Sequence, residues 1–314
     1  MKIGIDIMGG DFAPNAALDG INQAYQNPPE NLELVLLGDQ SIIESYLDEH
    51  GLSKDHFKII HSEEVIEMGE SPTKAFSKKP KSSISIGFKL LSEGKIDVFL
   101  SAGNTGAMMV GSLYTVKAIE GVLRPSVTTL VPKENGDYGI MLDAGANADC
   151  KQDVLYQFGL LGSLYSKYVY KNDNPRVGLL NIGSEKEKGN VETKAAYPLL
   201  EASEKINFIG NVEGHDLFKD VADVYVCDGF TGNIVLKSAE SIIEIIKQRG
   251  IKDEFFKQFD YENYGGTPIL GVNKSVMIGH GVSSPTAFKN MIMLSQDIVD
   301  ARLIEKMKAE FESY

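Results

Sequence analysis

Short apolar runs alternate with longer amphipathic segments along almost the whole chain. The short runs predict strands at residues 2–6, 34–37, 57–61, 96–100, 127–131, 139–142, 177–181, 207–209, 224–227, 269–272 and 276–278. The amphipathic segments predict helices at residues 15–25, 41–50, 83–92, from about 107, and at 154–170, 192–201, 234–247 and 285–311. Strands that alternate with helices form a mostly parallel sheet covered on both faces. The pattern therefore predicts an α/β protein.

The loop Ser101-Ala-Gly-Asn-Thr-Gly joins one predicted strand to the next helix. Gly103 and Gly106 would let the backbone come close to a ligand, and Ser101, Asn104 and Thr105 would offer neutral donors. Helix-first-turn amides point outward at such junctions. The loop predicts a cradle for an anion or a polarised carbonyl, and a plain tight turn is the alternative.

Four further junctions share this design, at residues 8–11, 143–147, 181–189 and 228–233. Each follows an apolar run and contains glycine together with Asp or Asn. Turn chemistry explains one or two such junctions. Five of them at one kind of position indicate a single site lined by loops from one edge of the sheet.

Charged residues near these loops have several interpretations. Lys188 lies on a glycine-flanked loop and suits a phosphate or an oxyanion, although a solvated surface lysine is the commoner case. Arg124 and Lys237 are the other cations near the loops. The strand-end aspartates could hold a metal, orient a lysine or cap turns, and we favour the last two because no compact acidic cluster occurs: Asp6, Asp11, Asp143 and Asp228. His61 and His280 are acid–base candidates or structural histidines.

Composition narrows the function. The chain has 314 residues, 43% of them hydrophobic and 24% charged, which is typical of a globular protein. Its net charge of -13 argues against nucleic-acid binding. The two cysteines form no ligand pattern, and the P-loop, dinucleotide and serine-elbow motifs are absent. Residues 98–116 carry no charge, but their turn-rich polar core does not suit a bilayer. We expect a soluble cytoplasmic protein without metal or cofactor.

Eight motifs in order resemble one known family: residues 8–14, 101–107, 124–125, 142–147, 178–189, 207–213, 228–233 and 264–266. Together they are similar to the bacterial phosphate acyltransferases of phospholipid synthesis (the PlsX family). The resemblance implies transfer of an acyl group from acyl carrier protein (acyl-ACP) to inorganic phosphate, which gives an acyl phosphate. It also implies a three-layer α/β/α fold like that of isocitrate and isopropylmalate dehydrogenases, shared with phosphotransacetylase. We expect one domain over 1–314, with two lobes flanking a cleft, in a homodimer loosely associated with the membrane.

One stretch departs from the family. The resemblance implies a long helical hairpin for dimer and membrane contacts after Lys237, whereas only residues 238–263 fill this place. Either the hairpin is short in this protein, or part of it is missing from the sequence.

The resemblance and the residue inventory together suggest roles. Phosphate is already a nucleophile and a thiol is a good leaving group, so the site needs mainly positioning and oxyanion stabilisation. We expect Lys188 on phosphate or the oxyanion and Asn233 on the carbonyl. The expected substrate-binding residues are Asp6, Gly9, Gly10, Asp11, Ser101, Gly103, Asn104, Thr105, Gly106, Arg124, Asp143, Asn147, Asn181, Asp228, Gly232 and His280. Lys74, Lys78, Lys79 and Lys81 form a basic connector that would dock the acidic carrier.

Three alternatives stay open. An NAD-dependent decarboxylating dehydrogenase shares the implied fold, and fold does not fix function. A phosphotransacetylase-like enzyme would take the acyl group from coenzyme A instead of the carrier protein. The third alternative is a non-catalytic module that binds phosphate or acyl groups.

Overall fold

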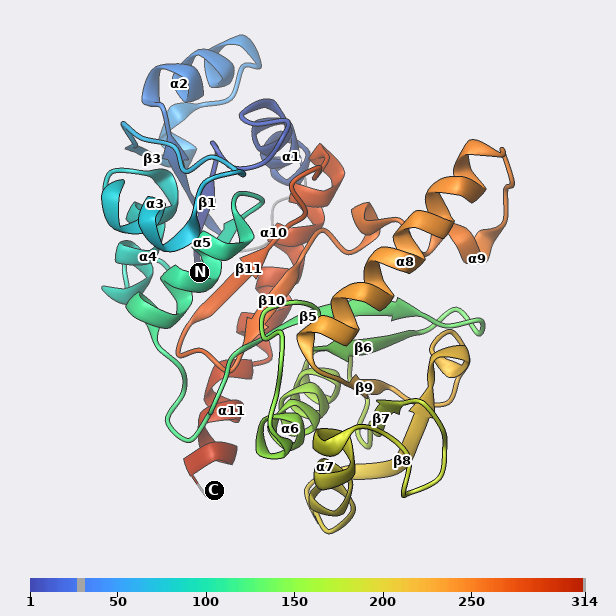
Figure 1. The fold of residues 1–314 in the computed structure, drawn as a ribbon. Helices are drawn as coiled ribbons and strands as arrows, with labels where there is room; N and C mark the ends of the chain where they lie inside the picture. The colour runs from blue at the N-terminus through green and yellow to red at the C-terminus, as the bar shows by residue number, and fades with distance from the viewer. Residues whose placement is uncertain (27–31, 313–314) are drawn as a thin grey trace. The chain divides into compact units, whose positions relative to one another are not determined.

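The computed structural model describes residues 1–26 and 32–312 and divides into two compact units (Figure 1). Unit 1 comprises Met1–Ala118 and Tyr261–Asp300, and unit 2 comprises Ile119–Asp260 and Ala301–Tyr314. The single domain expected over 1–314 includes residues 27–31 and 313–314, which lie outside the described residues.

Unit 1 contains a sheet in the order β3-β2-β1-β4-β11-β10 (Figure 1). All neighbours are parallel except β10 and β11. The strands are β1 (Lys2–Asp6), β2 (Glu33–Gly38), β3 (Phe57–His61), β4 (Val98–Ser101), β10 (Thr267–Leu270) and β11 (Ser275–Ile278). The helices are α1 (Asn15–Tyr25), α2 (Gln40–Glu49), α3 (Pro72–Lys78), α4 (Ser83–Ser92), α5 (Thr105–Gly111) and α10 (Pro285–Asp300), with short turns η1 (Lys54–His56), η2 (Ser112–Val116) and η4 (Tyr261–Asn263).

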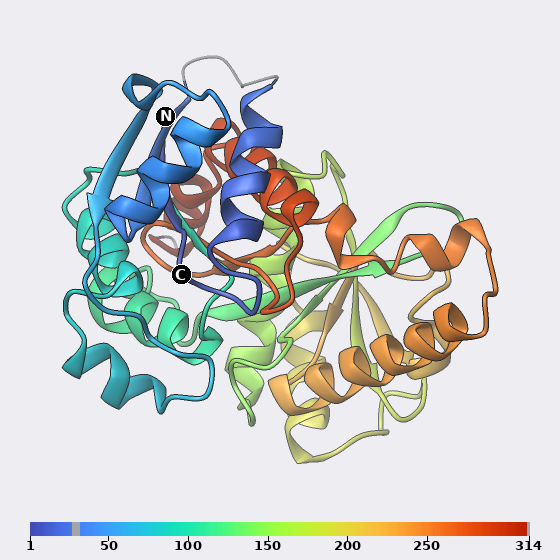
Figure 2. The same cartoon turned by 90° about the horizontal axis from the view of Figure 1, so that it is seen from above.

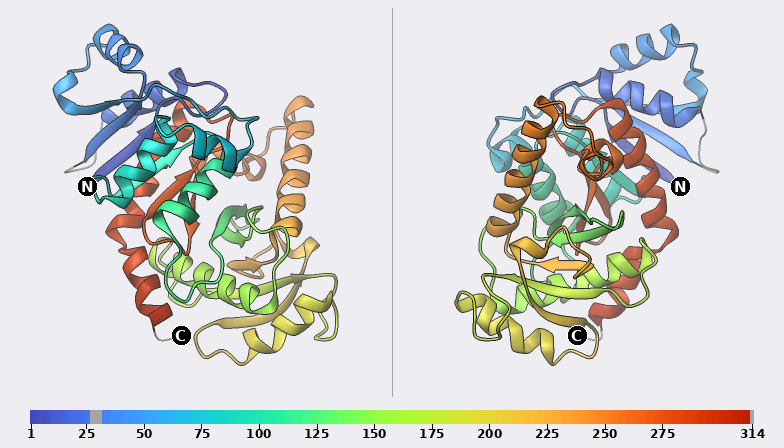
Figure 3. Two further views of the ribbon diagram at one scale, coloured as in Figure 1. Left: turned by 60° about the vertical axis from the view of Figure 1, so that its left-hand side comes forward. Right: turned by 90° about the vertical axis from the view of Figure 1, so that its right-hand side faces the viewer.

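Helices cover both faces of this sheet (Figures 2 and 3). Helix α4 packs on β1, β2 and β4, and α10 packs on β4, β11 and α1. The contact of α4 is aromatic, because Phe88 and Phe99 meet edge to face with ring centroids 5.1 Å apart. Both side chains are fully buried, and such a pair adds about 0.5–1.5 kcal/mol to the burial of its area.

The strands of unit 2 pair in the order β5-β6-β9-β7-β8, parallel except for β5 (Figure 1). The strands are β5 (Ser126–Pro132), β6 (Tyr138–Leu142), β7 (Arg176–Asn181), β8 (Asn207–Glu213) and β9 (Val224–Val226). The helices are α6 (Gln152–Tyr168), α7 (Val191–Glu201), α8 (Gly229–Gln248), α9 (Glu254–Lys257) and α11 (Leu303–Glu312), with the turn η3 (Gly214–Asp216).

Alternating side chains of β6 and β9 separate the two faces of this sheet. Leu142 and Val224 lie against Gly162 of α6. Met141 and Tyr225 belong instead to a buried cluster that Val235 and Leu236 of α8 help to cover. Successive side chains of a strand point to opposite faces, so α6 and α8 cover opposite faces. The predicted α/β class with a mostly parallel sheet and helices on both faces is confirmed.

Three local predictions differ from the structure. The basic connector contains the short helix α3, which Pro72 opens at a position that needs no backbone N–H. Helix α8 begins at Gly229 rather than Ile234, because the Asp228 carboxylate caps it by accepting from Thr231 N at 2.7 Å. The helix predicted over 285–311 is two helices, α10 and α11, and Arg302 between them has φ 50°. Within the described residues, no helix is both long and apolar enough to cross a membrane.

Candidate functional site

Three loops meet at the carboxyl edge of the unit 1 sheet. They follow β1, β4 and β11, which are parallel neighbours. Asp11 N donates to Gly281 O at 2.7 Å, and Gly279 N donates to Ser101 O at 2.9 Å. Two of the five predicted junctions, at residues 8–11 and at the start of the Ser101 loop, therefore lie side by side in this unit, next to the loop that follows β11.

Asp6 connects the loops after β1 and β4 through hydrogen bonds. Its buried carboxylate accepts from Ser101 Oγ at 2.7 Å and from Met8 N at 3.0 Å. Ser101 Oγ in turn accepts from Gly103 N at 2.9 Å. Burial raises the pKa of the Asp6 carboxyl, although these hydrogen bonds oppose the rise. A Cβ at Gly9 would overlap Asp6 Oδ2, so this close approach requires glycine.

Asn104 uses its side chain inside the protein. Its Oδ1 accepts from Ala107 N at 3.0 Å and caps α5. Its Nδ2 donates to three carbonyl oxygens of one earlier segment, those of Glu67, Met68 and Glu70, at 3.0–3.1 Å. Thr105 is exposed, and its hydroxyl has no hydrogen-bond partner among the described residues. The side chains of Ser101 and Asn104 thus stabilise the loop. The exposed hydroxyl of Thr105 is available to a ligand.

A second set of loops lies at the carboxyl edge of the unit 2 sheet. The buried Asp143 carboxylate accepts from Val127 N and Ala146 N at 3.2 Å. It also accepts from the backbone N and the Nδ2 of Asn147, at 2.5 and 2.8 Å. Burial raises the pKa of Asp143, as it does for Asp6. Asp143 therefore fixes the loop that follows β6.

The start of α8 closes against this loop. Gly229 N donates to Asn147 O at 2.7 Å, and a Cβ at Gly232 would overlap Asp143 O. A Cβ at Gly145 would lie 3.4 Å from Asn233 Oδ1, so the exposed Asn233 side chain lies beside the glycine loop. The β6 and β9 loops therefore form one surface that presents Asn233.

Lys188 stands on the neighbouring loop, after β7. Asn181 Nδ2 donates to Lys188 O at 3.1 Å and to Asn211 Oδ1 at 3.0 Å. A Cβ at Gly183 would lie 2.9 Å from Lys188 Cγ, so the lysine stem lies against this glycine. Lys186 of the same loop pairs with Glu201 at 2.5 Å, whereas Lys188 is exposed and has no ion pair within the described chain.

The remaining predicted residues lie in different surroundings. Arg124 is exposed on the segment before β5, and His280 is half-buried in the loop after β11. Lys79 is tied to Glu70 Oε2 and Val65 O, both at 2.6 Å, and Lys81 pairs with Glu63 at 2.8 Å. Exposed Lys74 and Lys78 have no ion pair in the described part of the chain, so the basic connector offers two free cations rather than four.

The predicted residues therefore form two groups, one in each unit. Unit 1 holds Asp6, Gly9, Gly10, Asp11, Ser101, Gly103, Asn104, Thr105, Gly106 and His280. Unit 2 holds Arg124, Asp143, Asn147, Asn181, Lys188, Asp228, Gly232 and Asn233. The structure adds Asn211, whose Nδ2 donates to Glu185 O at 2.8 Å and supports the Lys188 loop. Asn211 lies in the 207–213 motif of the sequence analysis, but nothing in that motif indicated that its amide supports this loop.

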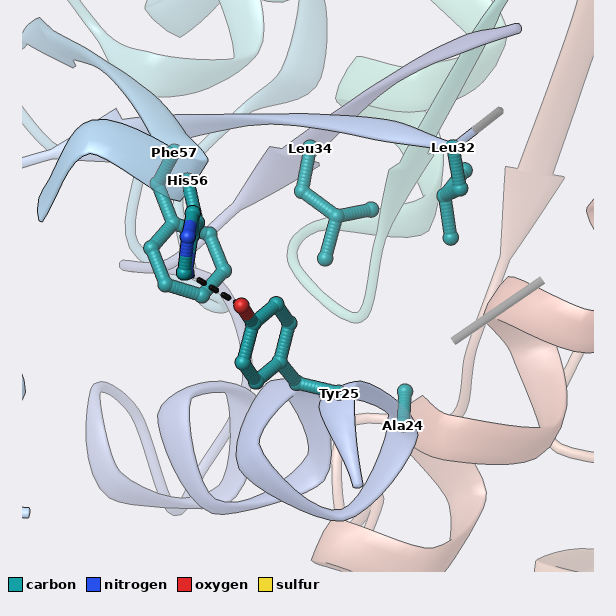
Figure 4. Close-up of a pocket in the computed structure, with 6 residues that line it drawn as sticks. All are labelled: Ala24, Tyr25, Leu32, Leu34, His56 and Phe57. Carbon is teal, nitrogen blue, oxygen red and sulfur yellow. Dashed lines mark hydrogen bonds between the residues drawn. The ribbon is translucent and has the colours of Figure 1, made fainter. Parts of the chain in front are cut away.

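A small pocket lies elsewhere in unit 1 (Figure 4). It has a volume of about 30 Å³ and is lined by Ala24, Tyr25, Leu32, Leu34, His56 and Phe57. Tyr25 OH and His56 Nδ1 form a hydrogen bond across it. None of the predicted site residues lines this pocket. Among the described residues, no group of three His, Cys, Asp or Glu side chains could hold a metal ion.

Residues 1–306 match the model of a family described as fatty acid synthesis protein. A phosphate acyltransferase of Halothermothrix orenii is 42% identical over 331 positions, covering 99% of this chain and 98% of that protein. A phosphate acyltransferase of Thermoanaerobacterium thermosaccharolyticum is 41% identical, covering 99% and 97%. The 331 aligned positions outnumber the 314 residues of this chain, so the first relative has residues with no counterpart here.

Solved structures share the fold. A phosphotransacetylase from Streptococcus pyogenes superposes with a TM-score of 0.65 at 17% identity, covering 95% of this chain and 94% of that one. A 4-hydroxythreonine-4-phosphate dehydrogenase from Burkholderia phymatum gives 0.51 at 16% identity, covering 96% and 98%. At sequence identities this low, the similarity shows a shared fold and does not show which reaction this chain catalyses.

Proposed function

This chain belongs to the family described as fatty acid synthesis protein, and we propose from that membership that it transfers a fatty acyl group from acyl-ACP to inorganic phosphate. The product would be an acyl phosphate for membrane phospholipid synthesis. The chain is accordingly an acyltransferase. The structural observation that carries the proposal is the carboxyl edge of unit 2, where Lys188 and Asn233 follow the neighbouring strands β7 and β9. Lys188 is exposed and has no ion pair among the described residues, and Asn233 is exposed near the start of α8.

The reaction needs no activated side-chain nucleophile. An oxygen of phosphate forms a bond to the thioester carbonyl carbon, and the carbon–sulfur bond then breaks. The sulfur leaves with that electron pair as the carrier's thiolate, which needs little acid assistance because an ordinary thiol has a pKa of about 8.5. The protein's own thiols are unsuited to attack, since burial raises the pKa of Cys150 to about 12 and that of Cys227 well above its usual value.

Lys188 and Asn233 would stabilise the charges that develop. The Lys188 ammonium would attract the phosphate oxygens or the oxyanion as a point charge. The Asn233 amide would donate to the carbonyl oxygen, where negative charge appears in the tetrahedral intermediate. Thr105 of unit 1 and Arg124 of unit 2 would bind further polar groups of the substrates. Asp6, Asp143 and Asn181 would act indirectly, by holding these loops in shape.

A direct assay tests this function. Purified protein is mixed with acyl-ACP and phosphate, released thiol is measured, and hydroxylamine traps the acyl phosphate as a hydroxamate. We expect thiol release that depends on phosphate, with trapped product in equal amount. A parallel reaction with acyl-coenzyme A identifies the donor, and one with NAD and a hydroxy acid tests for a dehydrogenase. Thiol release that ignores phosphate would show a thioesterase and contradict the proposal.

We also propose that the protein is a cytoplasmic homodimer with a loose membrane association. The support is an exposed apolar face on α8 and the residues after it, including Ile242, Ile245 and Ile251, each about half exposed. Such a face is typical of a contact surface on a folded protein. Sedimentation at several protein concentrations tests the dimer, and flotation with vesicles tests the membrane contact.

A further inference from the structure

Side-chain hydrogen bonds hold the backbone on both sides of Arg124. Leu123 N donates to Gln157 Oε1 at 2.8 Å. Pro125 O accepts from Asn147 Nδ2, also at 2.8 Å. The two bonded groups belong to the immediate sequence neighbours of Arg124, so its backbone position is fixed from both directions.

Within the described chain, the hydrogen bonds of the Gln157 side chain all go to this segment. It lies in α6, is 1% exposed, and has buried apolar residues such as Leu155 and Phe158 around it in the helix. Its Nε2 donates to Gly121 O at 2.8 Å, while its Oε1 accepts from Leu123 N. A buried amide is costly unless it is paired, and apolar packing of α6 does not require one. Both polar ends of Gln157 therefore serve the backbone on the N-terminal side of Arg124.

Asn147 holds the C-terminal side of Arg124 by a hydrogen bond to Pro125 O, and it connects this segment to the loop after β6. Its side chain is 8% exposed, and Nδ2 reaches both Pro125 O and Asp143 Oδ2 at 2.8 Å. Asp143 also accepts from Val127 N at 3.2 Å, and Val127 is the second residue of β5. The entry into β5 is thus attached to the same carboxylate that shapes the loop beside Asn233.

Arg124 itself is exposed and forms no ion pair with the described residues. A guanidinium presents a rigid fork of donors that matches two oxygens of a phosphoryl group. Such bidentate binding depends on the position of the backbone below it, because a displacement of about 1 Å can already reduce catalysis strongly. The Arg124 segment has a backbone held by hydrogen bonds and an exposed guanidinium, which is the arrangement that bidentate binding needs.

We propose that Gln157 and Asn147 are positioning residues that hold Arg124 in place to bind a phosphoryl group of a substrate. This inference rests on the proposed acyl transfer and names one contact within it. The phosphoryl group belongs either to inorganic phosphate or to the phosphate ester in the thiol-bearing arm of the acyl carrier. Both sources offer the same chemistry to Arg124.

Steady-state kinetics with each substrate varied in turn test the proposal. Arg124→Ala should raise the KM of one substrate, and the substrate affected identifies the source of the phosphoryl group. Gln157→Met fills nearly the same volume without either hydrogen bond. It should raise the same KM on the order of 10- to 100-fold, with a smaller change in kcat. Gln157→Glu keeps the acceptor for Leu123 N and should have an intermediate effect, and it serves if the Met variant does not fold.

The double variant separates positioning from simple support of the fold. If Gln157 acts through Arg124, Gln157→Met should have no further effect on that KM in the Arg124→Ala background. Ser163→Ala is the control on the same helix, because the buried Ser163 Oγ has Gly159 O, at 2.8 Å, as its one partner among the described residues. The control should leave both KM values unchanged. Equal KM increases by Gln157→Met in both backgrounds, or a lower Tm with unchanged KM values, would overturn the proposal.

A binding measurement distinguishes this failure from failure of the proposed function. Inorganic phosphate should raise the Tm of the parent protein, and the rise should be smaller in Arg124→Ala and Gln157→Met if inorganic phosphate is the ligand. The truncated carrier arm, phosphopantetheine, is the second probe. Stabilisation by neither probe in the parent would overturn the positioning role. A protein that a probe stabilises only when Arg124 is present, but that shows no phosphate-dependent thiol release, would support the positioning role. The same result would contradict the proposed acyl transfer.

Discussion

Two buried aspartates dominate the candidate site at the scale of single residues. Asp6 is the last residue of β1, and Asp143 directly follows β6. Both are fully buried and accept hydrogen bonds from loop N–H groups and a neighbouring polar side chain. Neither forms an ion pair with a described residue. The loop N–H groups that donate to these carboxylates already have their partner, so the two aspartates hold the loops in shape. Lys188 and Asn233, which we propose contact substrate, remain exposed.

Loss of either exposed residue should stop turnover without unfolding the protein. Lys188→Ala and Asn233→Ala each remove one contact to developing charge, which typically costs on the order of 10²–10³ in kcat. Both side chains are exposed, so we expect unchanged circular dichroism and Tm. Lys186→Ala is the matched control on the Lys188 loop, because Lys186 already pairs with Glu201 at 2.5 Å. Near-parental rates in both site variants would show that the assignment is wrong.

The sequence predicted glycine-containing loops at strand ends, and the structure has them there, but the sequence did not predict the direction of every side chain in them. Gly, Asp and Asn at strand ends are local signals that turn chemistry explains. Asn104 instead turns inward because it finds the carbonyls of Glu67, Met68 and Glu70, more than thirty residues earlier in the chain. Gln157 resembled any polar residue of an amphipathic helix until the fold placed Leu123 and Gly121 beside it. Such contacts depend on tertiary structure, which a single sequence does not reveal.

At the scale of elements, one ion network joins three strands of unit 2 at the edge opposite the candidate site. Lys133 follows β5, Arg176 begins β7 and Asp223 precedes β9. The Lys133 side chain is only 2% exposed and meets Asp223 Oδ1 at 2.6 Å, and Arg176 NH2 meets the same oxygen at 2.9 Å. Asp220 is more exposed and accepts from both cations. A buried lysine needs such a partner to remain charged.

Removal of the central carboxylate should destabilise unit 2. Asp223→Asn leaves the Lys133 charge buried without its closest partner, and breaking a buried pair in this way costs about 3–5 kcal/mol. Asp220→Asn is the matched control and should cost less, because the Asp220 side chain is 47% exposed. The chain has no tryptophan, so urea unfolding is followed by circular dichroism. An equal decrease in the free energy of unfolding in both variants would show that the burial of Asp223 does not strengthen its ion pairs.

The same network should make stability depend on acid pH. Burial disfavours the charge of Asp223, but hydrogen bonds from Arg176 and Lys133 outweigh it and hold the pKa of this carboxyl well below its usual value. A lowered carboxyl pKa contributes stability above the unfolded pKa of about 3.9, and this contribution is lost as the pH falls toward the folded value. The difference in unfolding free energy between parent and Asp223→Asn should therefore shrink below about pH 4. A constant difference from pH 7 to pH 3 would contradict this linkage.

At the scale of the whole molecule, the net charge of -13 opposes the approach of an acidic carrier protein. Productive docking then requires a local region of opposite charge. Lys74 and Lys78 lie in or at the end of α3, both exposed and without an ion pair among the described residues. Lys79 and Lys81 add little, because their charges are already matched by Glu70 and Glu63. Of the four lysines predicted to dock the carrier, Lys74 and Lys78 are therefore the two that we propose to test.

Charge reversal at these two lysines should weaken carrier binding and leave the chemical step intact. Lys74→Glu with Lys78→Glu should raise the KM for acyl-ACP about tenfold at low salt, because complementary charges mainly accelerate association. The effect should fade near 0.15 M salt, where the Debye length is about 8 Å, and kcat should stay close to the parental value. Lys58→Glu with Lys194→Glu is the matched control, since it changes the net charge equally at exposed lysines that form no ion pair within the described chain. A similar rise in KM for both pairs would show that total charge, rather than α3, governs the encounter with the carrier.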